Sequence, residues 1–326
     1  MTPYSRGRFG AKAPGFERPT QVPRDAEEHR RWQDANRAWW EATPMRYDWD
    51  AALGAEADST AYFEEIDRRF FGSARHFLPW RARPFDFVIP FDELGDKDVL
   101  EVGVGQGTHA QLIARHCRSF TGIDLTRAAV STAARRFQLF GVPARVAQMD
   151  AERMGFRDAS FDYVWSWGVV HHTADPRRAL EEIHRVLRPG GRCGLMVYYR
   201  SWWSYHVAGF AHALLRGEAL RPGGVPRARQ AATDGALARY YRPGEWHALV
   251  RGLFAVERLR ILGLKSDVLL LPAGWAKRAA MGALPDGLAR LLTTRLRMGS
   301  LMVVEMRKPA PPERAAAPAS ASRERI

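Results

Sequence analysis

Three glycines at alternating positions follow a short apolar run. Gly103, Gly105 and Gly107 come directly after DVLEV at 98–102. Glycines between a strand and a helix let the backbone approach a ligand closely, and the first N–H groups of the helix are free to bind it. Dinucleotide sites favour G-x-G-x-x-G, which seats a pyrophosphate. Here the third glycine comes one residue earlier and Glu101 lies just before the loop, so the pattern favours a ligand with an amino group and no phosphates.

Two more acidic residues end the next predicted strands. Asp124 ends the run SFTGID, and Asp150 with Ala151 follows the run ARVAQM. A carboxylate in the first of these places can accept hydrogen bonds from both hydroxyls of a ribose. A carboxylate beside a backbone N–H, as in the second, can bind the amino-bearing edge of an adenine. Because open α/β sheets bind ligands at the carboxyl ends of their strands, we expect Glu101, Asp124 and Asp150 to surround one ligand.

A pair of histidines follows the fourth predicted strand, FDYVWSW at 161–167. His171 or His172 is a candidate general base, because imidazole is the side chain that titrates nearest to neutral pH. The alternative is that both histidines are structural. Trp167 ends the strand and is expected to lie against the bound ligand.

Two groups of aromatic residues are candidates for the walls of a substrate pocket, since aromatic walls exclude water and can hold a flat or lipid-like molecule. One group is expected to form a lid, and the other follows the fifth predicted strand. For any single ring, packing between helices and sheet is the alternative. The lid group comprises Trp39, Trp40, Tyr47 and Trp49, and the second group comprises Tyr198, Tyr199, Trp202, Trp203, Tyr205 and His206.

Apolar β-type runs alternate with amphipathic helical stretches from about residue 97, which is typical of a doubly wound α/β fold with a mostly parallel sheet. Helices are expected at 107–117, 126–140, 175–187 and 243–253. The predicted strands are 98–103, 119–124, 144–149, 161–167 and 192–199, and a later pair at 254–263 and 300–308 would complete a seven-stranded sheet.

These motifs resemble those of the class I S-adenosylmethionine-dependent methyltransferases, in particular the small-molecule group (methyltransferase type 11) that includes the quinone-biosynthesis C-methylases. The matching stretches are VLEVGVGQG at 99–107, GIDLT at 122–126, 149–172 and IHRVLRPGG at 183–191. The resemblance implies a Rossmann-like fold, S-adenosylmethionine as cofactor and methyl transfer to a small-molecule or lipid-like acceptor. It also implies that Gly103, Gly105 and Gly107 approach the methionine part, that Glu101 orients its amino group, that Asp124 holds the ribose, that Leu125 packs on the adenine, and that Asp150 and Ala151 bind its edge.

The chain divides into five expected regions. Residues 1–26 and 309–326 lack apolar periodicity and are expected to be a mobile and a disordered tail. Residues 27–94 read as a helical, aromatic-rich cap, 95–200 as the cofactor-binding core, and 201–308 as a substrate-cap insertion with the final strands. Only Cys117 and Cys193 are present, which is too few for a disulfide framework, and no metal site is indicated. With no apolar run near the ~20 residues that span a bilayer, we expect a cytoplasmic protein.

The formal net charge of +13 is concentrated near the C-terminus, where residues 201–326 carry 20 Lys and Arg against 9 Asp and Glu. This excess leaves open a nucleic-acid acceptor, an anionic substrate or peripheral contact with a membrane. A nucleic-acid acceptor is disfavoured because no motif for exocyclic amines, cytosine nucleophile or RNA-binding module is visible. A non-catalytic S-adenosylmethionine-binding protein is a further alternative. A nicotinamide-dependent oxidoreductase is disfavoured by the glycine spacing.

Overall fold

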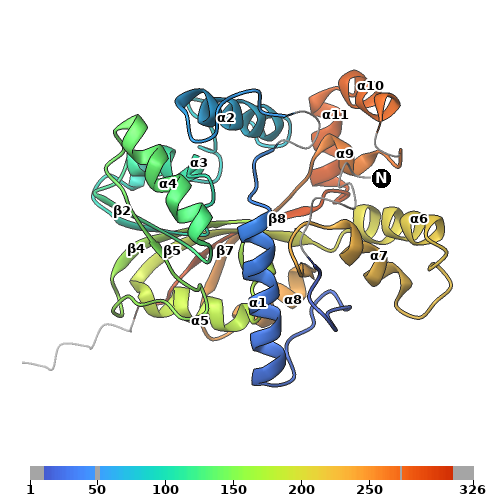
Figure 1. The fold of residues 1–326 in the computed structure, drawn as a ribbon, viewed down its shortest axis with the longest axis horizontal. Coiled ribbons are helices and arrows are strands. Elements are labelled where there is room, and N and C mark those ends of the chain that lie inside the picture. Colours follow the sequence, from blue (N-terminus) through green and yellow to red (C-terminus); the bar gives the residue numbers. More distant parts are fainter. Residues whose placement is uncertain (1–10, 48–51, 272–273, 311–326) are drawn as a thin grey trace, which may run out of the picture.

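The computed structural model describes residues 11–47, 52–271 and 274–310, and within them a central sheet has the strand order β3-β2-β1-β4-β5-β8-β7. The first five strands run parallel, and β8 is antiparallel to both β5 and β7. The α/β prediction is therefore confirmed (Figure 1). The strands are β1 Asp98–Val102, β2 Ser119–Asp124, β3 Arg145–Gln148, β4 Phe161–Trp167, β5 Leu187–Tyr199, β7 Ala255–Leu262 and β8 Leu301–Arg307.

An eighth, two-residue strand adds to the seven strands that were expected. The strand β6, Tyr240–Tyr241, pairs in parallel with the end of β5. Two residues are too short to show the alternation by which a strand is recognised in a sequence, so only the tertiary structure reveals it. It holds the segment before it against the carboxyl end of β5.

Helices cover both faces of the sheet, with α3 (Thr108–Ala114) and α4 (Arg127–Phe140) on one face and α5 (Pro176–Val186) on the other (Figure 1). Neighbouring residues of β1 pack on opposite faces of the sheet. Val99 packs in the core cluster that contains Ile113 of α3, whereas Leu100 packs in the cluster that contains Leu180 of α5. Helix α8 (Pro243–Val250) joins the second cluster through Trp246. Burial on both sides explains why β1 has apolar residues at the successive positions Val99 and Leu100.

Two N-terminal helices, α1 (Ala26–Ala42) and α2 (Thr60–Arg75), precede the sheet. Asp25 caps α1 by accepting the Glu28 N–H, and Ser59 caps α2 by accepting the Tyr62 N–H.

The prediction of a mobile tail is wrong for residues 11–25, because they pack against other parts of the protein. Phe16 is buried edge-on against Trp32, and the Ala13 N–H donates to the Ala236 carbonyl. These apolar residues show no periodicity and dock individually into sites made by distant residues, so their sequence pattern resembles that of a tail.

Two helical lobes, one after β5 and the other between β7 and β8, lie beside the sheet at the right of Figure 1. The first lobe contains a π-helix η3 (Trp202–Val207), α6 (Ala208–Leu215) and α7 (Gly224–Ala232). The second contains α9 (Lys265–Val268), α10 (Trp275–Ala283), α11 (Asp286–Arg290) and a π-helix η4 (Leu291–Arg295). The indole N–H of Trp202 donates to the Leu296 carbonyl and that of Trp203 to the Asp267 carbonyl, so the lobes contact each other. Two 3-10 helices, η1 (Phe91–Glu93) and η2 (Val170–His172), complete the chain's elements in the described residues.

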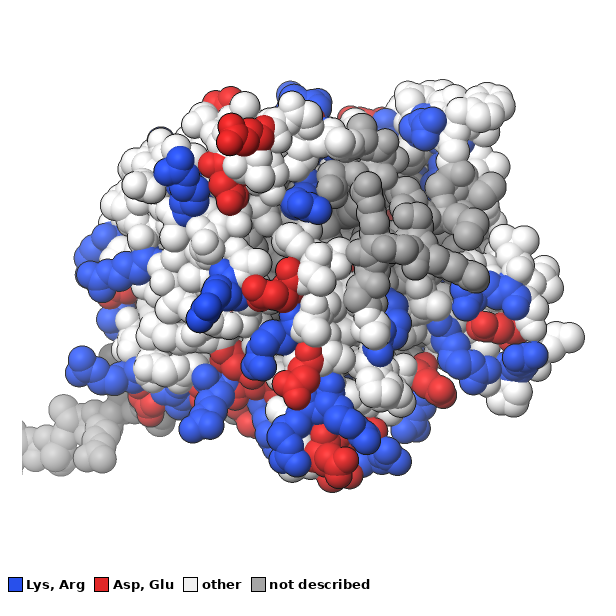
Figure 2. Space-filling view, in the orientation of Figure 1, with Lys and Arg blue, Asp and Glu red and all other residues white. Residues whose placement is uncertain are grey.

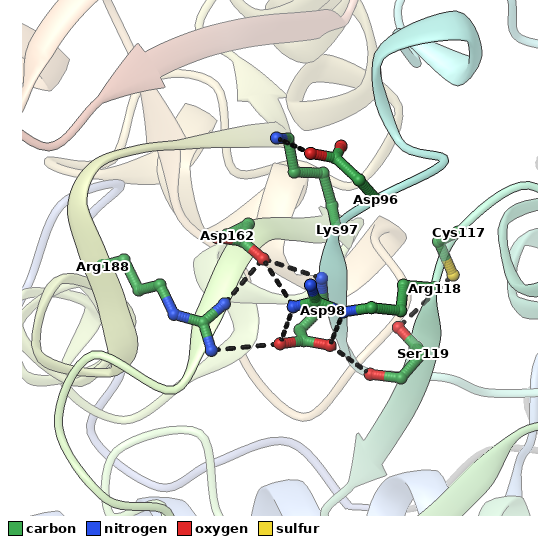
Figure 3. A network of polar contacts seen from close by, with 8 residues as sticks. All are labelled: Asp96, Lys97, Asp98, Cys117, Arg118, Ser119, Asp162 and Arg188. Carbon is green, nitrogen blue, oxygen red and sulfur yellow. Dashed lines mark hydrogen bonds and ion pairs between the residues drawn. The ribbon is translucent and has the colours of Figure 1, made fainter.

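A charge network ties the amino end of β1 to its neighbours (Figure 3). Asp98 pairs with Arg118 before β2 and with Arg188 in β5, and its backbone N–H donates to Asp162 of β4. The Arg118 hydrogen bond holds the pKa of Asp98 well below its ordinary value. This network lies at the opposite end of β1 from the glycine loop, so its role is to join strands. Among the described helices, none has the length and apolar character needed to cross a membrane.

Candidate functional site

A cavity of about 1590 Å³ opens at the carboxyl ends of the parallel strands. The three acidic strand ends predicted to converge all line it, although they are separated by up to fifty residues of sequence. The predicted site residues that line the cavity are Glu101, Gly103, Gly105, Asp124, Leu125, Asp150, Ala151, Trp167 and His172.

The three glycines of the first loop serve different purposes. All have positive φ, +80° at Gly103, +50° at Gly105 and +78° at Gly107, which disfavours other residue types. A Cβ on Gly105 would meet nothing within 4 Å, so this position faces open space. A Cβ on Gly103 would collide with Val169, and one on Gly107 would crowd Arg136. Gly105 therefore leaves room for a ligand, whereas Gly103 and Gly107 allow close packing, and Gly107 is not part of the cavity wall.

Glu101 is a buried carboxylate without a matching cation. Burial and, secondarily, the charge of Asp124 raise its pKa well above the ordinary value, and its Oε2 atom has no hydrogen-bond partner. His109 lies 3.9 Å from its other oxygen but does not neutralise it. The indole N–H of Trp165 donates to His109 Nδ1, and burial lowers the pKa of His109 to about 3. An orphaned buried oxygen of this kind fits a site for a ligand's amino group.

Asp124 is held in place by backbone donors. Its Oδ2 accepts the Gly105 N–H at 3.1 Å, and its Oδ1 accepts the Thr126 N–H and hydroxyl at 3.0 and 2.8 Å. Burial raises the pKa of Asp124, and the hydrogen bonds oppose that shift. The carboxylate is thus fixed at the end of β2 beside the glycine loop, where it can bind a ligand's hydroxyl groups.

Helix α1 contributes a site residue that the sequence reasoning missed. Gln33 donates from Nε2 to Asp150 Oδ2 at 2.6 Å, while its own Oε1 is buried and has no partner. A second orphaned acceptor therefore lies beside Asp150, where an amino-bearing base edge was expected. Residue spacing could not predict that Gln33 belongs to the site, because it lies more than a hundred residues before Asp150.

Arg136 fixes the position of the glycine loop from beneath. Its guanidinium is fully buried and donates to the Gln106 carbonyl, the Thr108 hydroxyl and Gln111, while it pairs with Asp67 of α2. The loop, α4 and the N-terminal cap are therefore joined through one side chain. The sequence around Arg136 did not indicate that this residue of α4 would be buried or would bind the loop.

The two adjacent histidines differ in access to the cavity. His171 is fully buried, stacks 4.0 Å from Tyr198 between ring centroids, and is not part of the cavity wall. Of the two candidate bases, only His172 therefore borders the cavity. His172 lines the cavity, and its Nδ1 lies 2.7 Å from the Leu237 carbonyl. Since a carbonyl only accepts, Nδ1 carries the proton and Nε2 has the lone pair; burial lowers the pKa of His172, which favours this neutral form.

Polar and aromatic groups surround His172 in the cavity wall. Tyr198 donates its hydroxyl to Asp234 Oδ1 at 2.6 Å, and Trp40 meets the His172 ring edge-on at 5.1 Å. Asp234 was not predicted, because it lies in a stretch without recognisable periodicity.

Of the expected aromatic walls, Trp40, Tyr47 and Tyr198 line the cavity. Trp49 lies outside the described residues. Trp39, Tyr199, Trp202, Trp203, Tyr205 and His206 are not part of the wall.

Much of the remaining cavity wall comes from the two lobes, which supply apolar residues together with the charged side chains of Arg229, Lys265, Asp267, Lys277 and Arg278. It includes Ala208, Ala211 and Leu215 of α6, and Leu269, Leu270 and Met281 of the second lobe. Pockets for drug-sized ligands occupy roughly 300–1,000 Å³. A cavity of about 1590 Å³ therefore has room for a nucleoside-sized ligand and a second, bulky molecule.

Comparisons with known proteins agree with this geometry. Residues 100–195 match a family model described as a methyltransferase domain. A phthiotriol/phenolphthiotriol dimycocerosates methyltransferase of Mycobacterium tuberculosis is 42% identical over 101 residues, covering 30% of this chain and 37% of that protein. A ubiquinone biosynthesis O-methyltransferase of Pseudomonas paraeruginosa is 32% identical over 152 residues, covering 45% of this chain and 66% of that protein. The match thus spans little more than a third of the first relative's length.

A solved structure shares the fold at low sequence identity. The methyltransferase in a complex with the Trm112 activator from Haloferax volcanii aligns with a TM-score of 0.51 at 18% identity, covering 82% of this chain and 99% of that one. The family match covers the strands that build the cavity, so residues 100–195 carry a methyltransferase domain, and the structural alignment shows a shared fold.

Proposed function

We propose that this protein transfers a methyl group from S-adenosylmethionine to a lipid-like acceptor. The observation that carries the proposal is the buried, partnerless Oε2 of Glu101 beside the open face of Gly105. The cofactor, when bound, supplies a methyl group activated by its sulfonium. Glu101 would hold its amino group, Asp124 its ribose, and Leu125 its adenine, with Asp150, the Ala151 N–H and Gln33 at the adenine edge. Trp167 would lie along the methionine side.

His172 is the proposed proton acceptor. With Nδ1–H fixed on the Leu237 carbonyl, its Nε2 lone pair is available at the cavity wall. In the proposed reaction the bound cofactor would supply an electrophilic methyl group, and Nε2 would accept the proton that the acceptor's nucleophilic atom loses. The demethylated cofactor and the methylated acceptor are the products. Holding the nucleophile in line supplies most of the expected acceleration, and the base adds to it.

A lipid-like hydroxyl compound is the acceptor class that we favour. Apolar walls from both lobes and a volume beyond one cofactor support a bulky, apolar molecule. The relatives named for phthiotriol dimycocerosates and for an O-methyltransferase of ubiquinone biosynthesis also support this class. We propose a cytoplasmic location, which is supported by two unpaired cysteines, Cys117 and Cys193.

The test uses cofactor labelled in its methyl group, incubated with the protein and total lipid extract of the source organism. A labelled product that partitions into the organic phase is expected. Replacing His172 with Ala should lower kcat and remove the acidic limb of its pH profile, while cofactor binding by calorimetry stays intact. His247→Ala, an exposed histidine on α8, is the matched control.

Three outcomes would overturn the proposal. Failure of the parent protein to bind the demethylated cofactor at millimolar concentration would remove the cofactor assignment. Binding without transfer to any lipid or small-molecule pool would favour a non-catalytic binding protein instead. Labelled RNA or DNA, with retention on filters that weakens as salt rises, would favour the nucleic-acid alternative.

A further inference from the structure

The exposed face of helix α6 lacks the polar side chains that a solvated helix normally carries. No charged residue occurs between Val207 and Leu215. Gly209 and Ala213 are buried, and Gly209 lies against Arg229 and Val225 of α7. Phe210 and Leu214, four residues apart and thus on one face, are 48% and 61% exposed. Apart from the half-buried His212, every residue of α6 is apolar or glycine, and an apolar face that the protein does not enclose is typical of a helix that meets an apolar environment.

The second lobe continues this apolar surface. Of the fourteen large hydrophobic side chains that are exposed in the described residues, twelve lie between Trp202 and Leu296. They include Trp275 at 78% exposure on α10, and Leu288 and Leu291 on α11 and η4. Single exposed apolar residues are ordinary, but a concentration in two contacting lobes marks an interaction surface.

This apolar surface borders the mouth of the cavity. Leu215 is both part of the cavity wall and 84% exposed. On the opposite lobe, Leu270 and Leu271 also line the cavity and are 48% and 42% exposed. A molecule bound to the lobes would therefore lie directly at the entrance to the proposed acceptor site.

Positive charge accompanies the apolar residues. The lobe segments 202–221 and 265–297 contain eight Lys and Arg against three Asp and Glu. Arg216 and Arg221 are exposed after α6, and Arg278, Arg295 and Arg297 are exposed on the second lobe. The side of Figure 2 on which the lobes lie is mainly white and blue. Apolar side chains with arginines around them match the boundary between acyl chains and anionic headgroups.

We propose that the two lobes dock on an anionic lipid bilayer, so that the acceptor enters the cavity from the membrane; this rests on the lipid-like acceptor of the proposed function. Charge complementarity favours a bilayer over a second copy of the chain, because two copies of the same basic surface repel each other. Phe210, Leu214, Trp275 and Leu291 insert at the interface. Arg216, Arg221 and Arg278 contact the headgroups.

The test is co-sedimentation of the full chain with phosphatidylcholine vesicles, with and without one quarter phosphatidylglycerol. The parent protein should bind the anionic vesicles at least tenfold more tightly, and added salt should weaken that binding. The double substitution Phe210→Ser and Leu214→Ser changes no charge and should weaken vesicle binding at least tenfold. Phe87→Ser removes a phenyl ring of similar exposure, 43%, away from the lobes and should have no effect.

Calorimetry with the demethylated cofactor separates this inference from the proposed function. If the parent binds that cofactor but not the anionic vesicles, or if the double variant binds vesicles like the parent, the docking surface is wrong and the methyltransferase proposal stands. If the cofactor does not bind, the proposed function fails. A parent dimer that the double substitution dissociates in sedimentation velocity, without vesicle binding, would assign the surface to a second copy and overturn the inference.

Discussion

Replacing Glu101 with Gln tests the central electrostatic feature of the cavity. The parent carboxylate is 2% exposed, and its Oε2 has no partner in the protein. We expect it to form a charge-assisted hydrogen bond with the amino group of the cofactor. Such bonds contribute about 1.5–3 kcal/mol. Because 1.4 kcal/mol corresponds to a factor of ten, the substitution should raise Kd roughly tenfold to 150-fold.

Proton release provides a second measure of the same contact. Burial raises the pKa of Glu101 in the ligand-free protein, which favours the protonated carboxyl. A bound ammonium group favours the carboxylate and lowers this pKa, so a proton leaves on binding. Affinity should therefore rise with pH until the raised pKa is passed, and then level off. Calorimetry of the demethylated cofactor in two buffers with different ionisation enthalpies measures the proton count.

Glu101→Gln should lower the affinity for the cofactor but raise the stability of the ligand-free fold. A carboxyl whose pKa is raised by folding binds more protons in the folded state than in the unfolded chain, so it destabilises the fold as pH rises above the unfolded pKa of ~4.3. Glu101→Gln removes this cost, and the ligand-free variant should unfold at a higher temperature than the parent at pH 7. A gain in stability together with a loss of affinity is the signature of a binding residue rather than a packing residue.

Glu181→Gln, on the exposed surface of α5, is the matched control and should change neither quantity. The reasoning is refuted if Glu101→Gln binds the cofactor within twofold of the parent with the same proton release. It is equally refuted if the variant is less stable than the parent at pH 7.

Three further substitutions test the loop and the two charge networks. Gly105→Asp fills and charges the open side of the loop and should abolish cofactor binding in calorimetry, with far-ultraviolet circular dichroism unchanged. Arg136→Met leaves Asp67 unpaired and removes the bonds beneath the loop; we expect a loss of about 3–5 kcal/mol in urea unfolding, and a loss below 1 kcal/mol would contradict the assigned role. Asp98→Asn should cost about 1 kcal/mol at pH 7, because Arg118 lowers the pKa of Asp98 on folding, and this difference should shrink as pH falls below ~4. A difference that persists at low pH would mean that charge is not its cause.

The sequence by itself determined the sheet and the placement of three acidic groups. Each strand and the acid at or beside its carboxyl end lie in one local segment, and parallel strands bring their carboxyl ends to one edge. Glu101, Asp124 and Asp150 were therefore predictable without any long-range contact. The glycine positions were predictable too, although their separate roles depended on neighbours such as Val169.

Only the tertiary structure decided which groups complete the cavity. Gln33 meets Asp150, and Asp234 meets Tyr198, through contacts between segments that share no local pattern. The turn after β4 places His172 in the cavity wall and its equally buried neighbour His171 outside it, a difference that the spacing of adjacent identical residues cannot encode. Hydrophobic periodicity records which face of an element is buried, whereas a site assembled from distant segments depends on packing that forms only when the whole chain folds.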